Sequence, residues 1–275
     1  MKIAITGSDG QLGRALQAEL GGRHALMPLP HREFDVGDRA VIGQLAALQP
    51  DVVLHCAAMT NVDGAARDPA AAFRVNAFGT QNVALACQKC NAALVYISTN
   101  EVFDGTKAAP YLEFDPTHPI NAYGKSKLAG EWYTRHLLEK FYIVRTCWLY
   151  AKGGGKFPDK ILELAGRQTA LSVVRDELGS PTYVPDLARA LAQLIATEQY
   201  GVYHLVNAGS CSRYEWAVEI LQRANLPRPV KPITLAEYSR ASTPPPNGAL
   251  ENFAAATLLD IRLRPWQEAL AAFFE

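Results

Sequence analysis

The most constraining feature of the sequence is a short apolar run that leads directly into a glycine-rich turn and a helical pattern. The run covers residues 2–6 (KIAIT), and Gly7, Gly10 and Gly13 follow it within the segment GSDGQLG. Apolar residues then recur with the spacing of one helix face. A strand, a glycine turn and a helix in this order predict the first unit of a parallel β-α sheet.

The same alternation continues along the first half of the chain. Further strand-like runs cover residues 24–29, 51–55, 94–98 and 142–146, and helical patterns cover residues 38–48, 69–90 and the segment around Tyr123. Short apolar strands between helices predict an α/β fold, a Rossmann-type doubly wound parallel sheet with helices on both faces. Because the C-terminal ends of such strands meet at one edge, we expect the segments after them to line a single cleft.

The composition of the sequence changes after residue 151. Three consecutive glycines at residues 153–155 predict a flexible joint, and prolines become frequent beyond it. We therefore expect a dinucleotide-binding domain over residues 1–151, to which later segments return. Residues 152–275 are expected to form mainly a smaller substrate-binding lobe.

Charge and hydropathy argue against several classes of protein. The chain has 275 residues, and its 27 basic and 27 acidic residues cancel, so no nucleic-acid surface is expected. No apolar run approaches the roughly 20 residues of a membrane span, and residues 1–7 lack a signal-peptide pattern. Five cysteines, an odd number, fit a reducing compartment. We expect a cytoplasmic protein with neither nucleic-acid nor membrane partners.

The glycine turn is typical of a dinucleotide site. Glycine allows a tight turn and a close approach of a pyrophosphate, whose charge the N-terminus of the next helix stabilises. A glycine-rich turn without a ligand is the alternative. Arg32 follows the second strand, where NAD enzymes carry a carboxylate, so NADPH with its 2′-phosphate is favoured and NADH stays open. Asp35 is expected to cap the next turn or to contact the adenine.

Tyr123 and Lys127, four residues apart, are candidates for an acid–base centre. At this spacing they share one helix face, and the ammonium is expected to lower the phenol pKa from roughly 10 toward neutrality. Such a phenol is a workable general acid. Ser98 and Thr99 end the fourth strand, where a hydroxyl can polarise a carbonyl oxygen together with Tyr123. The pair alone also fits an ordinary helix, and its position after the glycine turn and Thr99 favours catalysis.

These motifs resemble those of the extended short-chain dehydrogenase/reductases and, within them, of the dTDP-4-dehydrorhamnose reductase family. The resemblance runs nearly from end to end. Its markers are TGSDGQLG at residues 6–13, AAMTNVD at 57–63, NA at 76–77, STNEVF at 98–103, YGKSK at 123–127, RTCWLY at 145–150, GSPT at 179–182 and RPW at 264–266.

The resemblance implies a role for the matched residues. Tyr123 would donate a proton, Lys127 would lower its pKa and hold the nicotinamide ribose, and Thr99 would be the third catalytic hydroxyl. The candidate cofactor contacts are Gly7, Gly10, Gln11, Leu12, Gly13, Arg32, Asp35, Val36, Ala57, Ala58, Thr60, Tyr123 and Lys127, and the candidate substrate contacts are Thr99, Asn100 and Trp148. The implied reaction is reduction by NADPH or NADH of a 4-keto group on a nucleotide-linked deoxysugar, giving dTDP-L-rhamnose, in a monomer or homodimer.

Departures from the family pattern leave the substrate open. The family usually has Asp-Tyr where this chain has Asn100 and Glu101; nucleotide-sugar dehydratases have Asp-Glu, but an asparagine cannot donate their acidic proton. The arginine expected near the C-terminus is absent from residues 244–250 (PPPNGAL). Ala15 replaces a metal-binding glutamate of some bacterial members, so no metal site is expected. The alternatives are a sugar-nucleotide reductase or epimerase with another substrate, and a non-catalytic regulatory protein like the β subunit of methionine adenosyltransferase.

Overall fold

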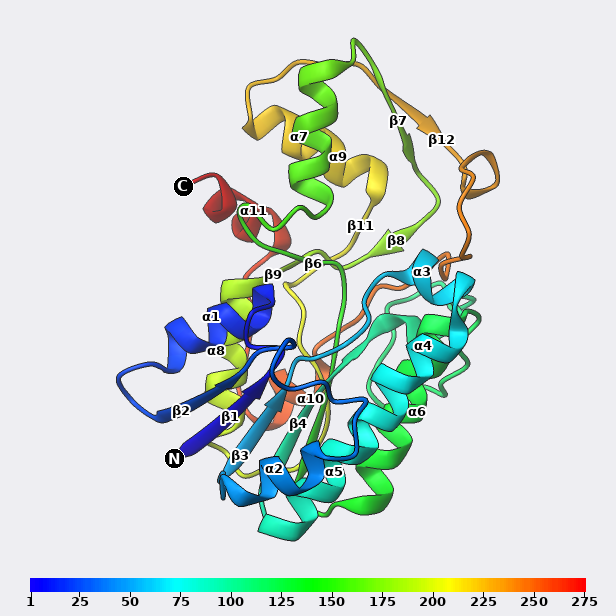
Figure 1. Ribbon diagram of the computed structural model, residues 1–275. Helices are drawn as coiled ribbons and strands as arrows, with labels where there is room; N and C mark the ends of the chain where they lie inside the picture. Colours follow the sequence, from blue (N-terminus) through cyan, green and yellow to red (C-terminus); the bar gives the residue numbers. More distant parts are fainter.

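The computed structural model describes all 275 residues and contains a central six-stranded parallel sheet (Figure 1). Its strands are β1 (Lys2–Thr6), β2 (Ala25–Leu29), β3 (Val52–His55), β4 (Ala93–Thr99), β5 (Phe141–Thr146) and β10 (Gly201–His204). Their order is β10-β5-β4-β3-β1-β2, and each neighbouring pair is parallel. The chain passes from β1 to β2 on one side and to β3 on the other. The doubly wound Rossmann-type sheet and its first five strands are therefore confirmed.

Helices cover both faces of this sheet (Figure 1). One face carries α1 (Gln11–Leu20), α8 (Val184–Leu194) and α10 (Phe253–Leu258), and the other carries α2 (Val41–Ala47), α5 (Gly79–Cys90) and α6 (Ala122–Leu137). Ile3 and Ile5 of β1 pack into the first core, whereas Ala4 packs into the second. Burial on both sides explains why the strands are apolar throughout. No helix combines the length and the hydrophobicity that a membrane crossing needs.

The helix expected over residues 69–90 is interrupted. It consists of α4 (Pro69–Phe73), a π-helical turn η1 (Arg74–Phe78), and α5. Asn76 in this turn is fully buried; its side chain accepts the N–H of Met59 at 2.9 Å and donates to the Ser126 hydroxyl at 3.0 Å. The π turn thus ties the segment after β3 to α6. The sequence patterns do not predict this turn or the preceding helix α3 (Val62–Arg67), and α2 is shorter than its pattern.

A smaller group of elements lies beyond the C-terminal edge of the sheet (Figure 1). It contains β6 (Leu149–Tyr150), α7 (Phe157–Arg167), β7 (Leu171–Val174), β8 (Leu178–Gly179), β9 (Thr182–Tyr183), β11 (Cys211–Ser212), α9 (Arg213–Arg223), β12 (Val230–Ile233), η3 (Leu235–Glu237) and α11 (Trp266–Phe274). It has its own aromatic core, in which Trp216 stacks on Trp148 with 5.6 Å between ring centroids. In contrast, α8, β10 and α10 belong to the sheet core although they follow residue 151. The division into functional domains at residue 151 stays a prediction.

Candidate active site

A cleft of about 520 Å³ opens where the C-terminal edge of the sheet meets the smaller lobe. The segments after β1, β3, β4 and β5 all contribute to its wall, which is the place expected for a ligand in a sheet of this topology. Their lining residues are Gly7, Gly10, Gln11, Leu12, Gly13, Cys56, Ala58, Thr60, Ile97, Ser98, Thr99, Asn100, Glu101, Thr146 and Trp148. The predicted convergence of four strand ends on one cleft is confirmed.

The glycine turn after β1 forms a close-packed backbone cradle. Gly7 has a φ of +63°, and a Cβ there would lie 2.8 Å from the amide nitrogen of Ala57. A Cβ at Gly13 would lie 2.6 Å from the Cα of Ser8. The helix α1 begins at Gln11, so the unpaired N–H groups of its first turn lie at the cleft. A pyrophosphate fits this cradle because no side chain fills it and the helix N-terminus favours negative charge.

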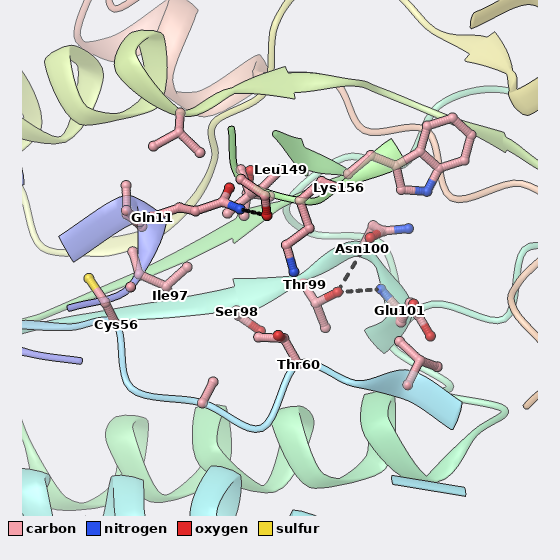
Figure 2. Close-up of a pocket in the computed structure, with 18 of the residues that line it drawn as sticks. Gln11, Cys56, Thr60, Ile97, Ser98, Thr99, Asn100, Glu101, Leu149 and Lys156 are labelled. Carbon is pink, nitrogen blue, oxygen red and sulfur yellow. Dashed lines mark hydrogen bonds between the residues drawn. The ribbon is translucent and has the colours of Figure 1, made fainter. Parts of the chain in front are cut away.

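A side-chain contact joins the glycine turn to the smaller lobe. The Gln11 amide donates a hydrogen bond to the carbonyl oxygen of Gly154, within the glycine-rich joint (Figure 2). Two residues later, Lys156 enters the cleft from the wall opposite Thr99. Its ammonium forms no salt bridge within the protein and is available to an anionic ligand.

The N-terminal turn of α6 brings Tyr123 into the cleft. Asn121 caps this helix, and its side chain accepts the N–H of Gly124 at 2.8 Å. A Cβ at Gly124 would collide with the carbonyl oxygen of Glu101, so only glycine lets α6 approach the end of β4 so closely. The structure thereby places Tyr123 beside Glu101, and Lys127 one turn further along the same helix also lines the cleft.

The charge of Lys127 is directed away from the phenol of Tyr123. Its ammonium donates to the carbonyl oxygen of Ile97 at 2.6 Å and lies 4.2 Å from the ring centroid of Tyr96. Burial lowers the pKa of Lys127 to about 7, although the Glu131 carboxylate acts in the opposite direction. The lysine is therefore a buried cation that is held mainly by backbone and aromatic contacts.

The pKa of Tyr123 is raised above its usual value, not lowered. Burial has the largest effect, the carboxylate of Glu101 adds to it, and the Thr99 hydroxyl acts in the opposite direction. The prediction that Lys127 brings this pKa toward neutrality is therefore wrong for this structure. The sequence spacing placed the ammonium on the correct helix face but could not show that burial outweighs its effect.

Thr99, Asn100 and Glu101 form one corner of the cleft (Figure 2). The Thr99 hydroxyl accepts the N–H of Glu101 at 3.2 Å. Asn100 is buried against Gly248, where a Cβ would collide with its amide. Glu101 accepts a hydrogen bond from the Asn121 amide at 2.6 Å. Burial raises the pKa of Glu101 to about 7, although this hydrogen bond works against the rise.

The smaller lobe contributes an aromatic wall with two cations. Trp148 has a φ of +46°, and the guanidinium of Arg213 lies 3.5 Å from its ring centroid. Trp216 stacks behind Trp148, and Lys156 is the second cation. Sequence reasoning identifies Trp148 but misses Lys156, Arg213 and Trp216. One available signal is the capping box that starts at Ser212 and predicts a helix beginning at Arg213.

Four of the predicted cofactor residues lie outside the wall of the cleft. Arg32 is exposed at the end of β2. Asp35 pairs with Arg74 at 2.9 Å, and this guanidinium lowers the pKa of the Asp35 carboxyl. Val36 is buried, and Ala57 lies behind the glycine turn, where its N–H donates to a threonine hydroxyl of β1. Their contacts to a cofactor stay predictions.

A known protein family matches the whole chain. The family described as the RmlD substrate binding domain matches residues 1–275. The chain belongs to this family. The spore coat polysaccharide biosynthesis protein SpsK of Bacillus subtilis (strain 168) is 36% identical over 276 residues, which cover 100% of this chain and 97% of the relative. A dTDP-4-dehydrorhamnose reductase of Aggregatibacter actinomycetemcomitans is 35% identical and covers 98% of this chain and 97% of the relative.

A solved structure extends the RmlD-family similarity to the backbone. The dTDP-4-dehydrorhamnose reductase of Bacillus anthracis str. Ames, determined in complex with NADP, has a TM-score of 0.96 and 39% identity. The match covers 99% of this chain and 98% of that structure. The family resemblance drawn from the sequence motifs is therefore confirmed.

Proposed function

We propose that this RmlD-family protein is an NADPH-dependent reductase of a 4-keto deoxysugar nucleotide. Its substrate is dTDP-4-dehydrorhamnose, and its product is dTDP-L-rhamnose. The observation that carries the proposal is that Thr99, Tyr123 and Lys127 line one cleft together with the glycine turn. Relatives named dTDP-4-dehydrorhamnose reductase, which match at least 98% of the chain, support the same activity.

The glycine turn would hold the pyrophosphate of the cofactor. Gly7 and Gly13 leave the space open, and Ala58 and Thr60 extend the wall along the end of β3. NADPH, when bound, supplies the hydride that reduces the ketone. Arg32 supports NADPH over NADH because a guanidinium pairs with a 2′-phosphate, and the Bacillus anthracis relative was determined with NADP.

Tyr123 would donate the proton that the reduced oxygen requires. Because its pKa is raised, its phenol is protonated at neutral pH and can give this proton to the oxygen as negative charge develops there. The Thr99 hydroxyl would hold the same oxygen by a hydrogen bond. Lys127, one turn further along α6, would hold the nicotinamide ribose.

Lys156 and Arg213 would bind the diphosphate of the sugar nucleotide. Both line the cleft on the side of the smaller lobe. They supply the positive charge that residues 244–250 lack, and so could replace the arginine that the family pattern has there. Trp148 and Asn100 would contact the remainder of the substrate.

A substrate panel tests this proposal. The protein is mixed with NADPH or NADH and with 4-keto deoxysugar nucleotides that differ in sugar and base, and loss of reduced-cofactor absorbance is followed. The fastest oxidation is expected for NADPH with dTDP-4-dehydrorhamnose. No oxidation with any ketone would contradict the reductase and favour a regulatory protein on the same fold. Oxidation with a different ketone alone would keep the reductase and replace the substrate.

The proposal also covers the location, assembly state and partners of the enzyme. We propose a cytoplasmic monomer or homodimer that has no nucleic-acid or membrane partner and needs no metal. The balance of 27 basic and 27 acidic residues supports the absence of a nucleic-acid surface. Light scattering after size-exclusion chromatography distinguishes the two assembly states, and activity after treatment with a chelator tests the independence from metal.

A further inference from the structure

Glu101 is an acidic group at the cleft that the proposed reduction does not use. It lies beside Tyr123 because Gly124 allows α6 to pack against its backbone. Its carboxyl accepts a hydrogen bond from Asn121 at 2.6 Å, and no lysine or arginine forms a salt bridge with it. A carboxyl in this position is free to take a proton from a bound ligand or give one to it.

The charges around Glu101 keep both of its protonation states accessible near neutral pH. Burial raises its pKa to about 7, and the Glu177 carboxylate acts in the same direction. The hydrogen bond from Asn121 and the guanidinium groups of Arg240 and Arg213 lower it. Each arginine is paired with another carboxylate, at 3.2 Å and 3.0 Å respectively. Glu101 therefore has no fixed counter-ion.

We propose that Glu101 is a base that removes a proton from a carbon next to the ketone of the substrate. The site then catalyses exchange of this proton with solvent when no hydride is transferred. The inference rests on the proposed function, because it requires a ketone whose oxygen is held by Thr99 and Tyr123. The backbone N–H of Glu101 donates to the Thr99 hydroxyl, and Glu101 lies beside Tyr123, so the carbons that flank the carbonyl come within its reach.

The step balances without an oxidant or a reductant. The C–H bond next to the carbonyl breaks, and its proton moves to Glu101. The electron pair forms a carbon–carbon double bond, while the carbonyl oxygen takes a proton from Tyr123 to give an enol. Reversal returns one proton from Glu101 to the carbon and one from the enol to Tyr123. Because the Glu101 proton exchanges with water in between, deuterium from D2O enters the sugar, and return from the same face keeps its configuration.

Deuterium incorporation followed by ¹H NMR tests the inference. The protein is incubated in D2O with NADP⁺ and dTDP-4-dehydrorhamnose, and oxidation of NADPH by the same ketone is measured in parallel. The signals of protons next to the ketone should disappear at least about 10-fold faster than without protein. Exchange no faster than in protein-free solution, with NADPH oxidation intact, would overturn the inference and leave the reductase standing. Absence of NADPH oxidation would contradict the proposed function itself, and with it the inference.

Variants assign the exchange to one carboxyl. Glu101→Gln should lower the ratio of exchange to NADPH oxidation about 100-fold, and Glu101→Asp should restore part of it. Glu139→Gln, at an exposed position outside the cleft, is the control and should keep both rates. Thermal unfolding of each variant verifies its fold. An unchanged ratio in Glu101→Gln would overturn the inference.

Discussion

The two walls of the cleft are built in different ways. On the sheet side, Thr99 ends β4 and Tyr123 begins α6, and backbone hydrogen bonds, a helix cap and a close glycine contact hold both in place. On the side of the smaller lobe, Lys156 and Arg213 depend on side-chain packing against aromatic rings and on a glycine-rich joint. We expect the sheet wall to determine the reaction and the lobe wall to determine which sugar nucleotide is bound.

Removal of the phenol at the sheet wall should have the largest effect. Tyr123→Phe takes away the proposed proton donor and is expected to lower kcat about 10²–10⁴-fold, with NADPH affinity nearly unchanged. Steady-state kinetics and fluorescence titration with NADPH measure the two quantities. Turnover equal to that of the wild type would show that the reaction is not determined by this wall.

The burial of the Glu101 carboxyl in the sheet wall can be measured through the pH dependence of stability. Its folded pKa of about 7 exceeds the ordinary value of 4.5, so the folded state binds more protons between these values. The free energy of unfolding of the wild type should therefore fall as pH rises from about 4.5 to 7 and level off above it. Glu101→Gln lacks this loss. Between pH 4.5 and 7 its free energy of unfolding should therefore rise relative to that of the wild type by at most about 3 kcal/mol. Parallel urea unfolding curves from pH 4.5 to 8 measure it, and a pH-independent difference would contradict the buried carboxyl.

A methyl group in the glycine cradle tests how tightly the sheet wall is packed. Gly13→Ala places a Cβ 2.6 Å from the Cα of Ser8, so it should lower the free energy of unfolding by about 2 kcal/mol and weaken NADPH binding. Gly166→Ala is the matched control, because a Cβ there meets nothing within 4 Å in helix α7. It should be neutral or stabilise by up to about 1 kcal/mol. Chemical unfolding and NADPH titration compare the two.

The lobe wall should show the smallest effect, and one confined to binding. Lys156→Met removes a charge that forms no salt bridge within the protein, so stability should not change, while KM for the sugar nucleotide rises about 10-fold. Lys152→Met, an exposed lysine of the same loop that does not line the cleft, should leave KM unchanged. A fall in kcat of Lys156→Met as large as that of Tyr123→Phe would remove the distinction between the two walls.

The sequence predicts the sheet wall far better than the lobe wall. Strand periodicity and the glycines locate the ends of β1 and β4, and helical spacing places Tyr123 and Lys127 on one face. Lys156 and Arg213 reach the cleft only through tertiary packing of segments that are distant in sequence. The capping box at Ser212 predicts the start of a helix at Arg213, but no local pattern shows that this helix end lines the cleft. The pKa of Tyr123 was also beyond prediction, because it depends on burial and on the contact with Glu101.

The π turn η1 adds one residue to the helical segment between α4 and α5, and this extra residue has a structural role. Hydrogen bonds in a π turn span five residues instead of four, so deleting one residue between Arg74 and Phe78 would convert η1 into a regular α turn while the flanking helices keep nearly their present orientation. Asn76 lies within this turn, so its amide would be displaced from Met59 and Ser126, which it now connects. A single-residue deletion here should therefore leave the helices on either side folded but disconnect the segment after β3 from α6.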